Sequence, residues 1–180
     1  MIKTMTRLEE LILFILDRAH KMGIENLSRF QIQKIIYMIQ VFAIKYAGKE
    51  FIPNITFIRE ENGPISPDIY ESTQKLVEQD KFVALDISKK EDYQFSRYGH
   101  KLKKQLPKLS FSLSETIFLD NFISDLLPLS QKKLKEITYS TEPMKEIINR
   151  EKGKINKGAK VNLSLIPIDP DVVDFYSDKR

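Results

Sequence analysis

The segment from Ser28 to Tyr46 constrains the fold more than any other part of the sequence, because it is apolar on nearly every helical face. Ser28 and Gln31 form a capping box at its start, and Gly48 follows its end. Apolar side chains lie between these signals at Phe30, Ile32, Ile35, Ile36, Met38, Ile39, Val41 and Phe42. A helix without a polar face has to be surrounded by other elements. We therefore expect a central helix inside a mainly helical fold.

Start and stop signals place further helices before and after this one. N-cap residues followed by helical apolar spacing predict helices from Thr6 to Gly23, over 66–79, 96–107, 112–127 and 130–139, and a short one from Thr141. A β-prone run at 55–58 predicts a short strand, and runs at 82–87 and 93–96 predict a β-hairpin. The predicted class is mainly α, a compact domain of about six or seven helices with a small, winged-helix-like β element.

The length of 180 residues suits one compact domain, so we expect a single domain over 1–180. Residues 151–162 are rich in lysine and glycine and are expected to form a flexible basic loop. Residues 163–180 are expected to form an extended C-terminal segment with a short helix.

Two features of the chain favour the cytoplasm. There is no cysteine, which fits a reducing compartment. The apolar run at 11–16 is too short to span a membrane, and no signal-peptide cleavage site follows it. We expect a cytoplasmic protein that does not contact a membrane.

Basic residues are concentrated in one part of the chain. Residues 97–160 hold 14 Lys and Arg against 7 Asp and Glu, whereas the whole chain carries only +4. Such a stretch can attract nucleic acid or an acidic protein. A solvated lysine-rich surface is the favoured explanation, because lysine is common on exposed helix faces.

The residues that usually build active sites are scarce. The two histidines, His20 and His100, are far apart in sequence, and neither lies near an acidic cluster with metal-ligand spacing. No thiol, no Gly-x-Ser-x-Gly elbow and no phosphate-binding glycine motif occurs. We therefore expect no enzymatic activity, no cofactor and no metal, and a protein that acts by binding another protein.

Three stretches form a recognisable constellation. They are Phe-Gln-Ile-Gln-Lys-Ile-Ile-Tyr at 30–37, Asn-Gly-Pro-Ile-Ser-Pro-Asp-Ile-Tyr at 62–70, and Leu-Lys-Glu-Ile-Thr-Tyr at 134–139 before Pro143. In this order and spacing the chain resembles the Panacea-domain family, which includes SocA-like antitoxins and GepA-type phage-associated proteins. The chain departs from the family pattern in that Met144 replaces a tryptophan, Tyr139 a histidine and Asn62 an aromatic residue.

The resemblance implies an antitoxin of a toxin-antitoxin system, with a cognate toxin as its partner. It also implies two mechanisms of neutralisation, direct binding alone or delivery of the toxin to a cellular protease. The toxin's identity, the oligomeric state and the chromosomal, plasmid or phage origin stay open.

The candidate toxin-binding residues come from the same three stretches and from the residue that follows the second one. They are Gln33, Lys34, Tyr37, Gly63, Pro64, Ser66, Asp68, Tyr70, Glu71, Thr138 and Tyr139. Structural roles compete with this interpretation at several of them. Gly63 and Pro64 suit a sharp corner. Tyr37 suits a core position with its hydroxyl bonded to the backbone, and Lys34 suits a side chain that extends outward to solvent.

A DNA-binding winged helix that regulates its own operon or a mobile element is the alternative from another class. Its recognition helix would be 67–79, where Asp68, Glu71 and Glu78 outnumber Lys75. DNA phosphates repel such a helix, so sequence-specific binding is disfavoured. Weak contact with DNA would come from the basic residues Lys89, Lys90, Arg97, Lys101, Lys103 and Lys104.

Overall fold

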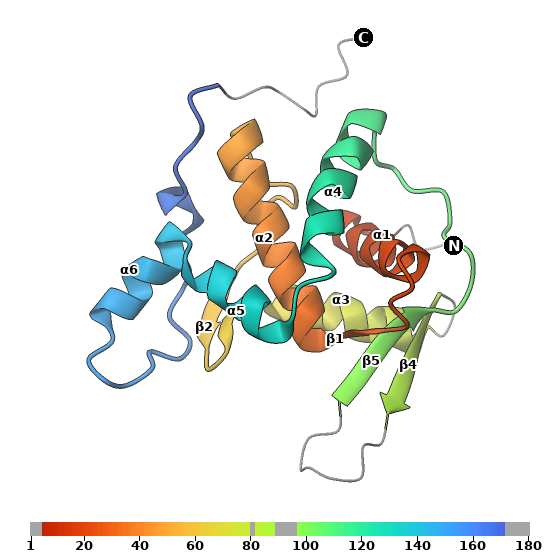
Figure 1. Ribbon diagram of the computed structural model, residues 1–180, viewed down its shortest axis with the longest axis horizontal. Helices are drawn as coiled ribbons and strands as arrows, with labels where there is room; N and C mark the ends of the chain where they lie inside the picture. Colours follow the sequence, from red (N-terminus) through yellow and green to blue (C-terminus); the bar gives the residue numbers. More distant parts are fainter. Residues whose placement is uncertain (1–4, 80–81, 89–96, 172–180) are drawn as a thin grey trace. The chain divides into compact units, whose positions relative to one another are not determined.

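The computed structural model describes residues 5–79, 82–88 and 97–171. For residues 84–88, 97 and 98 it describes the backbone alone. In chain order the elements are α1 (Arg7–Lys21), β1 (Leu27–Ser28), α2 (Arg29–Ala47), β2 (Ile58–Glu60), β3 (Gly63–Ile65), α3 (Pro67–Glu78), β4 (Val83–Ser88), β5 (Arg97–Leu102), α4 (Leu113–Leu126), α5 (Gln131–Tyr139), α6 (Glu142–Arg150) and the 3₁₀-helix η1 (Leu163–Leu165). Figure 1 shows them on the ribbon. The predicted class, mainly α with a small β element, is confirmed.

The chain groups into two compact units. Unit 1 comprises residues 1–32 and 69–110, and unit 2 comprises residues 33–68 and 111–180. Helix α2 begins in unit 1 and continues through unit 2, and helix α3 begins at the end of the unit 2 segment. No helix in the described part of the chain is long and apolar enough to cross a membrane.

Unit 1 combines α1, α3 and a three-stranded antiparallel sheet in the order β1-β5-β4. Helix α1 begins after Thr6, as predicted, at a capping box in which Thr6 and Glu9 exchange side chain–backbone hydrogen bonds. Strand β5 lies in the middle of the sheet and pairs His100 with both Leu27 and Leu85. Strand β1, which precedes α2, pairs with strand β5 of the hairpin that follows α3. The elements of the unit therefore have the expected winged-helix-like order.

The prediction of a helix at 96–107 is wrong, because residues 97–102 form strand β5 instead. The spacing of Tyr98, Leu102 and Leu106 fits a helix locally, but this segment pairs on both sides with β1 and β4. Gly99 packs so closely on Asn26 that an added Cβ would overlap the Asn26 side chain. The first hairpin strand is confirmed at 83–88, whereas 93–96 lies outside the described residues.

Unit 2 contains most of α2, helices α4 to α6 and the β2–β3 hairpin. Every residue of α2 from 32 to 41 is buried, as expected of the central helix. The strand predicted at 55–58 lies later, at 58–60. The Asn62-Gly63-Pro64 stretch turns the chain back into a second strand, so that Glu60 pairs with Gly63. Pairing with a second strand is a non-local event that local propensity does not reveal.

The lysine-rich segment after α6 returns along β2. Arg59 N donates to Ala159 O across 2.8 Å, Gly158 N donates to Arg59 O across 2.8 Å, and Ile58 forms a bridge with Lys160. Residues 152–158 are exposed. The predicted flexibility of 151–162 stays a prediction, but main-chain bonds hold the C-terminal end of this segment against the hairpin.

Candidate protein-binding site at the Gly63-Pro64 corner

Residues from each of the three motif stretches meet in unit 2, around the β2–β3 hairpin. We call corner site the group formed by Gln33, Lys34, Tyr37, Gly63, Pro64, Ser66, Thr138 and Tyr139, all of which were predicted from the sequence. Helix α2 supplies the first three residues, the hairpin and its exit supply the next three, and α5, which contacts β3, supplies the last two.

Gln33 binds the main chain of Ser66 at two points. Its Nε2 donates to Ser66 O across 2.9 Å, and Ser66 N donates to its Oε1 across 2.8 Å. Gln40, two helical turns further along α2, binds the main chain of Ile52 in the same way, at 2.9 and 2.7 Å. All four groups are buried, so each glutamine satisfies a backbone donor and acceptor that water cannot reach.

Lys34 is buried, with only 1% of its surface exposed, and its Nζ donates to Pro64 O across 2.7 Å. The prediction that it extends outward is wrong, because the hairpin offers its ammonium group a carbonyl inside the fold. Burial lowers the pKa of Lys34 to about 7, with smaller contributions from the charges of Lys135 and Arg59.

Gly63 has no room for a side chain. An added Cβ would lie 2.9 Å from the Tyr139 ring, 3.3 Å from Thr138 Oγ1 and 3.4 Å from Lys34 Cε. Its φ of 102° is also in the region that L side chains rarely adopt. The corner therefore needs glycine for two independent reasons.

Tyr37 is buried in the core and packs edge-on against Phe57, with ring centroids 5.1 Å apart. Its hydroxyl lies 2.7 Å from Thr141 Oγ1, which itself donates to Thr138 O. Because the threonine hydroxyl has a single proton, Tyr37 is the donor. Burial raises the pKa of Tyr37. The expected core role is confirmed, but the hydroxyl binds a side chain instead of the backbone.

Tyr139 lies between two cations at the rim of the corner site. Arg59 Cζ lies 5.1 Å and Lys135 Nζ 5.5 Å from the centroid of its ring. Its hydroxyl accepts from Arg59 Nη1 at 3.0 Å and donates to Glu61 O at 3.2 Å.

Arg59 was missed by the sequence analysis, although it is nearly as buried as Lys34. Its Nε donates to Glu151 Oε1 across 2.8 Å and its Nη2 to Oε2 across 3.3 Å. The two residues are 92 positions apart. No local spacing connects them, so no pattern in the sequence could have paired them.

The comparison with known families agrees with this geometry. A family model described as Antitoxin SocA-like, Panacea domain matches residues 32–144, more than half of the chain. The chain belongs to this family. No curated protein and no solved structure gives a match. The matched range contains every residue of the corner site.

The predicted site residues of this Panacea domain differ in exposure. Gln33, Lys34, Tyr37, Gly63, Pro64, Ser66 and Thr138 are buried, and Tyr139 is partly exposed. Asp68 is exposed, and its Oδ2 accepts from Thr56 N at 3.3 Å. Tyr70 and Glu71, in unit 1, are exposed as well. The buried residues therefore shape the Panacea domain, and only the exposed ones are available for direct contact with a partner.

The one basic side chain of helix α3 is engaged in an ion pair. Lys75 forms an ion pair with the buried Glu9 of α1, whereas Glu71 and Glu78 are exposed. Tyr70, which is 50% exposed, faces the Arg29 guanidinium at 4.8 Å. Within unit 1 of the Panacea domain, α3 therefore presents acidic side chains and one tyrosine to solvent.

The residues named for DNA contact are only partly described. Lys89 and Lys90 lie outside the described residues, as does the side chain of Arg97. Lys101, Lys103 and Lys104 are exposed, on β5 and directly after it. Among the described residues, no three His, Asp or Glu side chains gather where they could hold a metal ion.

Proposed function

We propose that this chain is the antitoxin of a toxin-antitoxin system and neutralises a cognate toxin by binding it, without catalysis, in the cytoplasm. The match of residues 32–144 to the SocA-like Panacea domain carries the proposal. It is supported by the corner site, where the motif residues act as structural supports and leave the surface for recognition.

The exposed part of α3 is the toxin-contacting surface in this proposal. Glu71 and Glu78 give it a negative charge, because Lys75 is already neutralised by Glu9. Tyr70 adds an exposed ring that makes a cation–π contact with Arg29. Tyrosine is enriched among the interface residues that contribute most to binding energy. A basic patch on the toxin is the complementary partner.

Growth rescue tests the proposal. The product of the adjacent reading frame is expressed alone and together with this chain, and we expect arrest in the first case and growth in the second. The double variant Glu71→Lys, Glu78→Lys should lose rescue and toxin capture. Asp125→Lys with Glu142→Lys makes the same charge change on exposed sites of α4 and α6 and should keep both. A harmless neighbour, with no partner captured, contradicts the proposal.

The two mechanisms of neutralisation differ in what happens to the toxin. Blocking leaves the toxin level unchanged, whereas adaptor activity lowers it through a protease. Toxin levels measured in protease-deficient and normal cells during co-expression distinguish the two.

DNA binding stays the second candidate, because the β1-β5-β4 sheet of unit 1 has winged-helix-like order and exposed lysines follow it. The acidic surface of α3 opposes entry into a groove. A mobility-shift titration on the chain's own promoter at rising salt decides. Retarded bands specific for that promoter support regulation, and binding that ignores sequence and disappears with salt reflects charge alone.

A further inference from the structure

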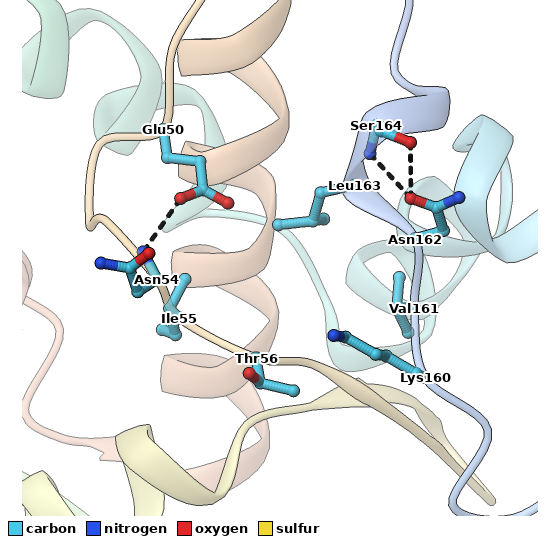
Figure 2. Close-up of a pocket in the computed structure, with 9 residues that line it drawn as sticks. All are labelled: Glu50, Asn54, Ile55, Thr56, Lys160, Val161, Asn162, Leu163 and Ser164. Carbon is cyan, nitrogen blue, oxygen red and sulfur yellow. Dashed lines mark hydrogen bonds between the residues drawn. The ribbon is translucent and has the colours of Figure 1, made fainter.

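A cavity of about 620 Å³ opens in unit 2 between two stretches of chain, a turn and the segment that leads into η1. One wall is the turn 50–56 and the other is the segment 160–164 (Figure 2). The lining residues are Glu50, Asn54, Ile55, Thr56, Lys160, Val161, Asn162, Leu163 and Ser164. The volume is typical of ligand-binding cavities.

The cavity lies where an antiparallel pair of chains separates. Below it, Val161 N donates to Phe57 O across 2.9 Å, and Ile58 bridges to Lys160. Beyond that point, no main-chain hydrogen bond joins 54–56 to 162–164 among the described residues. Because the two stretches stop pairing here, the space between them is open to a further segment of chain.

Opposite charges lie on the two walls. Glu50 projects from the first wall and Lys160 from the second (Figure 2). Within the described part of the chain neither forms an ion pair, although Glu50 Oε2 accepts from Asn54 N at 3.0 Å. The buried side chains of Ile55 and Val161 add apolar surface between the charges. A ligand with a cation and an anion separated by an uncharged stretch complements this arrangement.

The first wall also holds a backbone conformation that is rarely adopted. Asn54 has a φ of 62°, and no other described residue except glycine has a positive φ. Asparagine tolerates this region at a modest cost, and such residues gather at binding sites. The bond from Asn54 N to Glu50 keeps the turn, and with it the carboxylate, in place.

We infer that this cavity binds an extended peptide segment of a partner protein that carries a basic side chain opposite Glu50 and an acidic one opposite Lys160. The two separate charges favour a peptide over a free amino acid, because one peptide carries a basic and an acidic side chain on different residues and reaches both walls. The inference is independent of toxin neutralisation, since it concerns a different surface.

The test uses end-blocked tetrapeptides and NMR titration of the full chain. The probes are Arg-Val-Thr-Asp, its reverse Asp-Thr-Val-Arg, and the neutral Gln-Val-Thr-Asn. We expect one charged peptide to shift the amide signals of 54–56 and 160–164. It should bind at least about fivefold more tightly than the neutral one, since each exposed ion pair contributes up to about 1 kcal/mol.

Variants of the two charges separate specific binding from general attraction. Glu50→Gln and Lys160→Gln should each weaken the preferred peptide about two- to fivefold, and Glu142→Gln with Lys152→Gln should not. The swap Glu50→Lys with Lys160→Glu should invert the preference between the two charged peptides. Shifts confined to other residues, a neutral peptide that binds equally well, or equal binding of free arginine with aspartate would overturn the inference.

Discussion

The ammonium group of Lys34 lies 2.7 Å from the carbonyl oxygen of Pro64, 30 residues further along the chain, and both residues are buried. Together with Gln33 it bonds the outer edge of β3 to helix α2. Proline has no N–H, so this edge offers fewer groups to a neighbouring strand. Side chains of α2 thus take the place of a third strand on this side of the hairpin.

The buried ammonium group makes stability depend on pH. The pKa of Lys34 is lowered from 10.5 to about 7, so between these values the unfolded chain binds a proton that the folded chain has lost. The free energy of unfolding therefore rises by up to about 1.4 kcal/mol per pH unit between pH of about 7 and 10.5. Below that range, this group adds no pH dependence. Urea unfolding of the wild type should show a steeper rise than Lys34→Met, while the exposed Lys152→Met should match the wild type. Parallel curves for wild type and Lys34→Met would refute this.

Gly63→Ala is expected to destabilise the protein severely, by more than about 2 kcal/mol, because the new methyl group meets the Tyr139 ring. Gly153→Ala is the matched control. Its φ is also positive, at 75°, but nothing lies within 4 Å of an added Cβ, so it should cost only about 1–2 kcal/mol. Urea midpoints of the two variants give the comparison. Equal losses would mean that φ alone, and not the close packing, requires glycine at 63.

Gln33→Ala and Gln40→Ala should each cost about 2–4 kcal/mol, since each leaves a buried backbone N–H and C=O without a partner. Gln74→Ala serves as the control, because its bond to Glu78 is exposed, and it should stay within about 0.5 kcal/mol. Thermal unfolding measures all three. A loss below about 1 kcal/mol at both buried positions would show that water replaces the glutamines.

The Tyr37–Thr141 hydrogen bond is suited to a double-mutant cycle. Tyr37→Phe and Thr141→Val each remove one hydroxyl and keep the shape of the core. We expect a coupling of about 1 kcal/mol, as is usual for a buried neutral hydrogen bond. Strictly additive losses in the free energy of unfolding would contradict this bond. The Thr141→Val variant also loses the bond to Thr138 O, but the cycle removes that contribution.

Several parts of the fold were predictable because their causes are local. The capping boxes at Thr6 and Ser112 begin α1 and α4, and Ser28 exchanges bonds with Gln31 as expected. Strand β5 was not predictable, because its apolar spacing also fits a helix, and only pairing with β1 and β4 decides between the two. The candidate toxin-binding residues of the corner site were named from the sequence, and the core position of Tyr37 was expected, but the burial of Lys34 was not.

The sequence by itself determined most of the helices, the apolar central segment of α2 and the turn at Gly63, since residues within one helix or one turn decide these. Only the tertiary structure decided that Lys34 points inward, that Arg59 pairs with Glu151 and that the walls of the cavity carry opposite charges. Those contacts join residues far apart in the chain, and their energy depends on burial. Burial arises only once the elements have packed, so no short stretch of sequence contains it.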